Sequence, residues 1–162
     1  MKKNNISTKI KFIGILFLVL MISIISTTIY LNNKSKKDAL IINVAGKQRM
    51  LTQNISKNVF YLYYIKNGVH TELDNSVIEF VYNLNSLKDG NNLIGIEKAP
   101  TDLIAKQLAK VEIMWNTFYQ NIENFKKLNN KEDALSQNEL KKTIEAIYNT
   151  NTTLLNEVDN LV

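Results

Sequence analysis

Apolar residues follow two different patterns along this chain, one continuous and one periodic. The continuous pattern is a run of twenty uncharged residues from Phe12 to Leu31. At ~1.5 Å per residue, a helix of this length spans about 30 Å, which is the thickness of the hydrocarbon core of a bilayer. Lysines flank the run on both sides. The pattern therefore predicts a transmembrane helix at residues 12–31.

A cleaved signal peptide is the alternative interpretation of this run, because the chain also begins with a basic stretch. The run is longer than the roughly 7–15 apolar residues of a signal core, and no Ala-x-Ala-like cleavage site follows it. We therefore expect an uncleaved anchor. Four lysines precede it and three follow it closely. Together with the N-terminal amine, this asymmetry favours residues 1–11 as a cytoplasmic basic tail and the remaining chain outside the cytoplasmic membrane.

The periodic pattern begins after Lys37, where apolar residues recur at alternating steps of three and four, as in amphipathic helices. Four such segments follow one another with short connections. This pattern predicts an all-α fold, an antiparallel up-down four-helix bundle at residues 37–162. The four stripes are Ile41, Val44, Gln48, Leu51, Ile55, Asn58, Leu62 and Ile65; Leu73, Val77, Phe80, Leu84 and Leu87; Ile104, Leu108, Val111, Trp115, Phe118, Ile122, Phe125 and Leu128; and Leu140, Ile144, Ile147, Asn151, Leu154, Val158 and Leu161.

The connections between the segments carry their own signals. Gly68 is expected to end the first segment, Thr71 to cap the second, and Pro100-Thr101-Asp102 to open the third. Residues 89–99 form a long loop, from which three apolar side chains are expected to fold back on the bundle. These are Leu93, Ile94 and Ile96.

The composition excludes several classes of protein. The formal net charge is +5, but the part after Leu31 holds 16 basic and 15 acidic residues, so nucleic-acid binding is not indicated. There is no cysteine and a single histidine, His70, which is too few ligands for a zinc, haem or di-iron site. No glycine-rich phosphate loop is present. We therefore expect no enzyme, no metal and no cofactor.

Arg49 is the only arginine in the chain, beside 19 lysines. Guanidinium presents donors that match an oxyanion with two parallel hydrogen bonds, whereas ammonium is a point charge. Where lysine is so strongly preferred, a single arginine in an apolar helical pattern suggests an anion site. The alternative is an ordinary surface arginine.

The segment around Arg49 resembles a known family. Asn43-x-Ala45-Gly46-x-x-Arg49-Met50, followed by Leu51-Thr52-Gln53, resembles the start of the PilJ-type domain. That domain is the extracytoplasmic N-terminal domain of type IV pili methyl-accepting chemotaxis transducers. The segment also resembles the corresponding part of the NarX/NarQ nitrate and nitrite sensor kinases. The resemblance extends more weakly to Trp115 and to Asn151 with Leu154-Leu155, and covers about residues 37–162.

This resemblance implies a helical bundle that dimerises in the membrane and holds a small oxyanion at the dimer interface. The motif arginine of each subunit would bind the anion, a role that falls on Arg49. Gly46 would let the two first helices approach closely. The family often has a second arginine where this chain has Asn54, and some members have arginine in place of Lys47. With one arginine, anion binding is expected to be weaker or the ligand to differ from nitrate.

Other residues near Arg49 complete the predicted site. Asn43, Lys47 and Gln48 are further ligand-binding candidates, although Gln48 can equally be a register-fixing polar core residue. Counting along the helices, Gln48, Trp115 and Asn151 could share one layer roughly 20 Å above the membrane. This aromatic face and the two amides would form an anion pocket beside the dimer-facing arginine, with Trp115, Asn151 and Asn54 behind the directly binding residues. A buried tryptophan with two satisfied amides is the alternative.

The predicted function is therefore that of a membrane-anchored sensor domain of a chemotaxis transducer or sensor kinase, working as a homodimer or paired with a related receptor. The chain ends at Val162 without an output module. It would thus be the front end of a longer transducer, or would act through partners. The alternative function is a non-sensing, membrane-anchored protein that pairs with a full-length receptor and modulates it.

Overall fold

The structure, a computed structural model, describes residues 6–65, 68–98 and 101–161. These residues form four helices: α1 (Ile6–Tyr64), α2 (Thr71–Asp89), α3 (Asp102–Leu128) and α4 (Ala134–Asp159). A single antiparallel bridge, Asn91–Ile96, is the other regular element in the described ranges. The predicted all-α class is confirmed. Residues 1–5 of the expected basic tail, Pro100 and Val162 lie outside the described residues.

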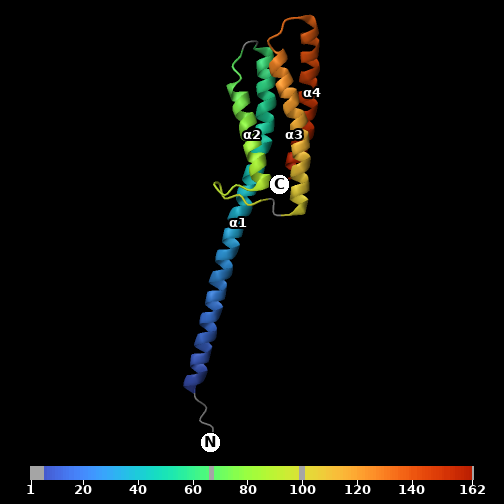
Figure 1. The fold of residues 1–162 in the computed structure, drawn as a ribbon. Helices are drawn as coiled ribbons and strands as arrows, with labels where there is room; N and C mark the ends of the chain where they lie inside the picture. Colours follow the sequence, from blue (N-terminus) through green and yellow to red (C-terminus); the bar gives the residue numbers. More distant parts are fainter. Residues whose placement is uncertain (1–5, 66–67, 99–100, 162) are drawn as a thin grey trace. The chain divides into compact units, whose positions relative to one another are not determined.

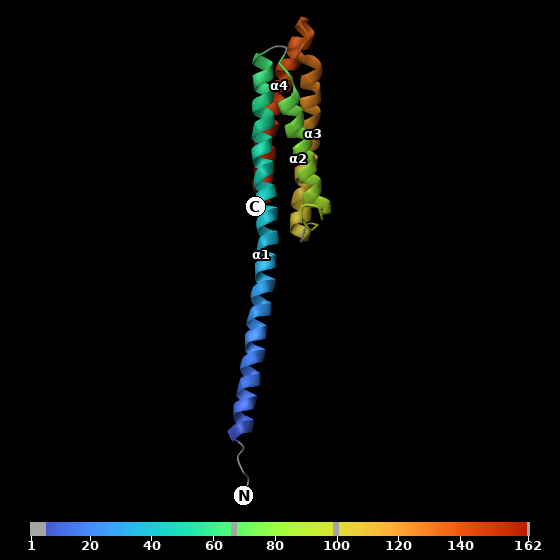
Figure 2. The same cartoon turned by 90° about the vertical axis from the view of Figure 1, so that its left-hand side faces the viewer.

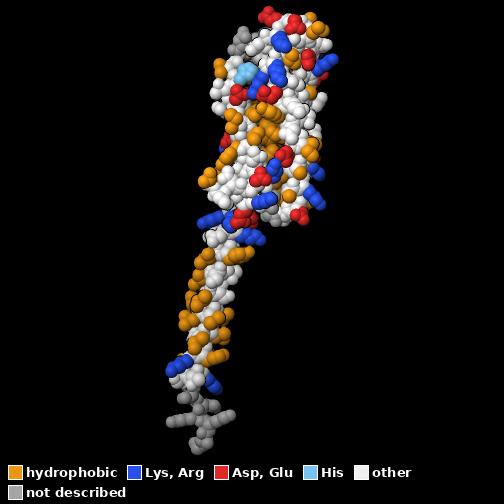
Figure 3. All heavy atoms as spheres, in the orientation of Figure 1, with side chains coloured by type: hydrophobic (Ala, Val, Ile, Leu, Met, Phe, Trp, Pro, Cys, Tyr) orange, Lys and Arg blue, Asp and Glu red, His pale blue; other side chains and the backbone are white. Residues whose placement is uncertain are grey.

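Helix α1 contains both the apolar run and the first bundle segment. No glycine or proline lies between Leu31 and Lys37 to end a helix there, so one helix continues where two elements were expected. The chain divides into two compact units after Ala39. The run at 12–31 is exposed throughout, and Figure 3 shows its apolar side chains with lysines beyond them. By length and composition this helix could cross a membrane.

The unit from Leu40 onward is the four-helix bundle (Figures 1 and 2). Most of its core comes from the four predicted stripes, which face one another because each helix has one apolar side. Ile65 of the first stripe is instead 47% exposed, and Ala45 and Val59 of α1 join the core without having been predicted. Burying each large apolar side chain contributes roughly 1.5–3 kcal/mol. The largest fully buried side chains are Leu51, Ile55, Leu73, Phe80, Ile96, Leu108, Phe118, Ile122, Phe125, Leu140, Ile147 and Leu154.

Contacts between neighbouring helices fix the antiparallel register of the bundle. Between α1 and α4, Arg49 pairs with Asp159, and the rings of Phe60 and Tyr148 lie 6.5 Å apart. Higher residue numbers in α1 therefore lie beside lower residue numbers in α4, as in antiparallel helices. Two ion pairs show the same antiparallel arrangement for α2 and α3. Lys88 pairs with Glu112 at 2.8 Å, and Asp74 pairs with Lys126 at 2.6 Å.

The helix starts follow the predicted caps in part. Helix α3 starts at Asp102, at the predicted opening, and Thr101 caps it: its hydroxyl accepts from the Ile104 N–H at 3.3 Å. Asp133 caps α4, where hydrogen bonds from Ser136 lower the pKa of the Asp133 carboxyl. The prediction for Thr71 is wrong. Residue 70 is the N-cap of α2, Thr71 is its first helical residue, and no side chain caps this end.

The end of α1 and the loop after α2 also differ from what the sequence predicted. Helix α1 ends at Tyr64, before the expected Gly68. In the loop, Ile96 is buried as expected, but Leu93 is 95% exposed and Ile94 is 37% exposed. The Asn91 N–H donates to the Ile96 carbonyl at 2.7 Å, which closes a tight turn and directs its tip outward. Gly90 and Gly95 permit this turn, because both have positive φ.

Candidate ligand-binding site

Four consecutive residues at the start of the bundle part of α1 point in different directions, because each step turns a helix by about 100°. Gly46 faces outward, Lys47 forms an ion pair with Glu79 of α2, Gln48 is buried, and Arg49 forms an ion pair with Asp159 of α4. These side chains therefore do not converge on one pocket within the single chain.

Arg49 lies at the surface beside the end of α4. Its Nε is 3.2 Å from Oδ1 of Asp159, and the two side chains are 61% and 40% exposed. An exposed pair of this kind contributes only ~0–1 kcal/mol to stability. Because 61% of the Arg49 side chain stays exposed beside Asp159, the guanidinium remains accessible to an oxyanion.

Gln48 lies in the core instead of beside the guanidinium of Arg49. Its Nε2 donates to the backbone carbonyl of Phe80 at 3.0 Å, and its Oε1 is buried with no partner in the described part of the chain. Phe80 stacks on Trp115, with ring centroids 3.9 Å apart and an interplanar angle of 18°. Gln48 and Trp115 thus share one level of the bundle through Phe80, as predicted.

Asn151 does not share that level. The register set by Arg49–Asp159 and Phe60–Tyr148 places Asn151 opposite residue 57 of α1. That position is nine residues beyond Gln48, or about 13 Å along the helix. The expected three-residue layer is therefore wrong for Asn151, because counting from the chain's end gave an incorrect offset for α4. Its Oδ1 is buried without a hydrogen-bond partner among the described residues.

The remaining candidates lie on or near the outer side of α1. Gly46 is exposed, and a Cβ built on it would meet no heavy atom within 4 Å. Asn43 is exposed and Asn54 is half-buried. Met50, one turn beyond Gly46, is 49% exposed. The motif segment therefore presents an open helix face with Arg49 at its edge on the α4 side.

Two carboxylates that contact the motif were missed by the sequence analysis. Asp159 pairs with Arg49 and Glu79 pairs with Lys47. In the sequence each is an ordinary charged residue on the solvent side of an amphipathic helix. Only the register of α2 and α4 against α1 brings them to the motif.

Comparison with known proteins identifies the family of this chain. The family model PilJ, described as the N-terminal domain of type IV pili methyl-accepting chemotaxis transducers, matches residues 30–153. The chain belongs to the PilJ family. This match confirms the resemblance found in the segment around Arg49. The bundle of this PilJ member is therefore a chemotaxis sensor domain.

A solved structure is similar to this PilJ bundle: the ligand-binding domain of the nitrate receptor McpN from P. aeruginosa. The TM-score is 0.60 and the identity is 22%, with 75% of this chain and 90% of that chain covered. At this identity the likeness shows a shared fold. The comparison with curated proteins gives no match.

Proposed function

We propose that the bundle senses a small oxyanion, such as nitrate or nitrite, bound by Arg49 at an interface between two copies of the chain. The observation that carries the proposal is the exposed guanidinium of the only arginine, at the edge of an open helix face. The nitrate receptor whose ligand-binding domain shares this fold makes nitrate a reasonable first ligand to test.

The open face of α1 suits close approach by a second helix. Asn43, Gly46, Met50 and Gln53 follow one another at steps of three and four, and all are exposed. Gly46 has no neighbour where a side chain would project, so a partner backbone can come near, as at other small-residue helix contacts. Packing two copies on this face brings two Arg49 side chains toward each other.

An anion between the two arginines supplies the signal in this proposal. Two guanidinium groups repel each other, and a shared oxyanion neutralises them with charge-assisted hydrogen bonds. Binding therefore favours one packing of the two α1 helices over another. Because α1 continues without a break through residues 12–31, a shift of this helix can pass into the proposed membrane segment.

We propose the following topology for the chain. Residues 1–11 form a cytoplasmic tail, residues 12–31 span the membrane once, and residues 37–162 form the sensor bundle on the extracytoplasmic side. The support is the exposed, uncharged run in α1, with lysines on both sides.

A thermal-unfolding screen of the full chain in lipid nanodiscs tests the anion proposal. Nitrate and nitrite are compared with chloride at equal ionic strength, since screening changes the interactions of exposed charges. One oxyanion should raise the midpoint of unfolding in a saturable way. If none does, the sensor has another ligand or the chain modulates a partner receptor, and anion binding by Arg49 is abandoned.

Asp159 competes with the anion for Arg49, so Asp159→Asn should raise the affinity for the bound oxyanion about threefold. The change removes one negative charge from an exposed pair worth ~0.2–1 kcal/mol. Isothermal titration with nitrate at low ionic strength measures the effect. Glu139→Gln, an exposed carboxylate at the other end of α4, is the control and should leave the affinity unchanged. Weaker binding in Asp159→Asn would instead mean that Asp159 holds Arg49 in its binding position.

A further inference from the structure

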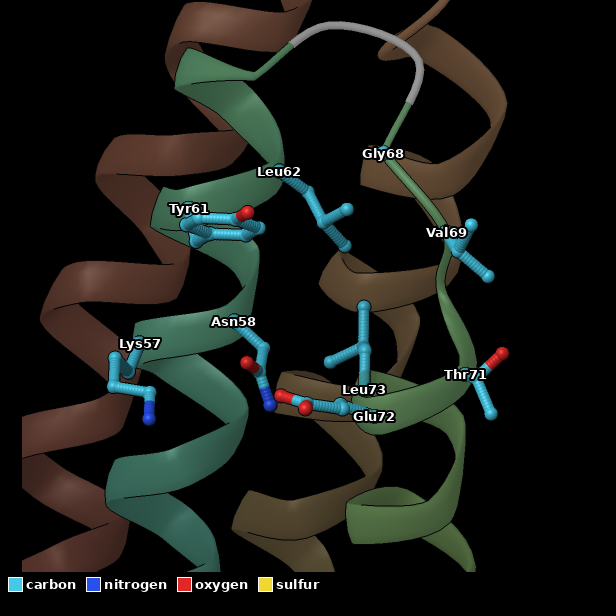
Figure 4. A pocket seen from close by; sticks show the side chains of 9 residues that line it. All are labelled: Lys57, Asn58, Tyr61, Leu62, Gly68, Val69, Thr71, Glu72 and Leu73. Atoms are coloured by element: carbon cyan, nitrogen blue, oxygen red, sulfur yellow. The ribbon is translucent and has the colours of Figure 1, made fainter.

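A second candidate site lies at the other end of the bundle part of α1. There, a cleft of about 540 Å³ opens between the last turns of α1 and the segment that leads into α2 (Figure 4). This volume lies in the range of roughly 300–1,000 Å³ that small-molecule sites occupy. The cleft is lined by Lys57, Asn58, Tyr61, Leu62, Gly68, Val69, Thr71, Glu72 and Leu73.

Two opposite charges line this cleft without pairing. Lys57 comes from α1 and Glu72 from α2, and both side chains are exposed. Elsewhere, Lys47, Arg49, Lys88 and Lys126 all form ion pairs with carboxylates of neighbouring helices. Within the described part of the chain, neither Lys57 nor Glu72 takes part in such a pair. The cleft therefore offers one cation and one anion that form no ion pair with each other.

Asn58 adds a polar side chain to the lining of the cleft. It is only 7% exposed, and its amide makes no hydrogen bond with any described residue. Figure 4 shows the Asn58 and Glu72 side chains extending toward each other from α1 and α2. The amide is therefore available to hydrogen-bond a polar ligand in the cleft.

The start of α2 provides further donors at the same place. The first backbone bond of α2 runs from the Asp74 N–H to the carbonyl of residue 70, and no side chain caps this end. The N–H groups of Thr71, Glu72 and Leu73 therefore precede the helical bonds, and these residues line the cleft. A helix N-terminus attracts a carboxylate, although Glu72 beside it would repel an anion that carried no positive group.

We propose that this cleft binds a small zwitterion, namely a free α-amino acid with an aliphatic side chain. Its ammonium group pairs with Glu72, and its carboxylate pairs with Lys57 and the open N–H groups of α2. Asn58 can donate to the carboxylate and accept from the ammonium group. Leu62, Val69 and Leu73 supply the apolar wall for the ligand side chain. The bound ligand then bridges α1 and α2.

This site is separate from the one proposed at Arg49. Lys57 lies eight residues beyond Arg49, which is about 12 Å along the helix. The two sites also need different ligand chemistry, since Arg49 takes an anion and the cleft takes both signs of charge. An experiment can therefore refute the cleft site without refuting the Arg49 site, and the reverse.

Isothermal titration of the full chain in nanodiscs tests the proposal, with leucine and valine as probes. Isopentylamine is leucine without its carboxylate, and isocaproate is leucine without its ammonium group. Saturable binding of leucine or valine is expected, with the amine and the acid at least about tenfold weaker, because each lacks one charge-assisted contact. If neither amino acid binds, or if the amine or the acid binds as well as leucine, the zwitterion site is overturned.

Variants locate the binding within the protein. Lys57→Gln and Glu72→Gln should each weaken leucine binding about tenfold or more, whereas Lys141→Gln and Glu139→Gln, exposed on α4, should leave it unchanged. Arg49→Ala should keep leucine binding and lose only the response to nitrate. Far-UV circular dichroism checks that each variant is folded. Leucine binding that survives both cleft variants would place the ligand elsewhere and refute the assignment.

Discussion

Arg49→Ala is expected to abolish the stabilisation of the sensor domain by the proposed oxyanion ligand. A ligand that binds only the folded state at a hundredfold excess over its Kd contributes about 2.7 kcal/mol, or roughly 10 °C in the midpoint of a bundle of this size. Alanine removes the guanidinium that makes the charge-assisted hydrogen bonds, so this shift should vanish. Without ligand the variant should lose less than about 1 kcal/mol, since the pair with Asp159 is exposed.

Lys47→Ala is the matched control for this experiment. It removes a cation two residues away on the same helix, but that cation pairs with Glu79 of α2. The oxyanion shift should therefore persist in this variant. If Lys47→Ala abolishes the shift and Arg49→Ala does not, the anion binds on the α2 side of α1 and the role assigned to Arg49 is wrong. Thermal unfolding followed by far-UV circular dichroism gives both results.

Of the substitutions proposed in this protein, Phe80→Ala should lower the free energy of unfolding most. We expect the free energy of unfolding to fall by about 3–5 kcal/mol, as for other buried aromatic residues cut back to alanine. Phe80 is fully buried and stacked on Trp115, and its carbonyl accepts from Gln48. The loss is a large part of the roughly 5–15 kcal/mol that stabilises a typical domain.

Urea unfolding of the Phe80→Ala variant, followed by circular dichroism and by the fluorescence of Trp115, measures this loss. Trp115 is the only tryptophan, so its emission reports on the aromatic stack directly. Ile78→Ala on the same helix is the control, because Ile78 is 66% exposed and should change stability by about 0.5 kcal/mol or less. A loss below about 1 kcal/mol for Phe80→Ala would contradict the packing of the aromatic stack.

The proposed anion site and the aromatic stack are connected through Gln48. Its side chain links α1 to α2 one residue before Arg49, and it leaves one buried oxygen without a partner among the described residues. A shift of α1 on ligand binding would therefore act on the hydrogen bond from Gln48 to Phe80, and so on the contact between α1 and α2.

The sequence by itself determined the fold class, the family and most residues of the core. Apolar steps of three and four require that one side of each helix be buried, and four such sides joined by short loops have few ways to do so. The buried apolar residues of α2, for instance, are those of its predicted stripe, and only the polar Asn83 and Ser86 are buried in addition. The motif around Arg49 was equally clear, because it is a local pattern within a single helix.

Only the tertiary structure decided which residues meet across the helices. Register depends on loop conformation and side-chain packing, and an error of a few residues moves a side chain several ångströms along a helix. For this reason the sequence misplaced Asn151, gave no sign that Asp159 pairs with Arg49, and directed Leu93 and Ile94 inward. The cleft between α1 and α2 was also unforeseen, because Lys57 and Asn58 of α1 come near Glu72 of α2 only in the folded bundle.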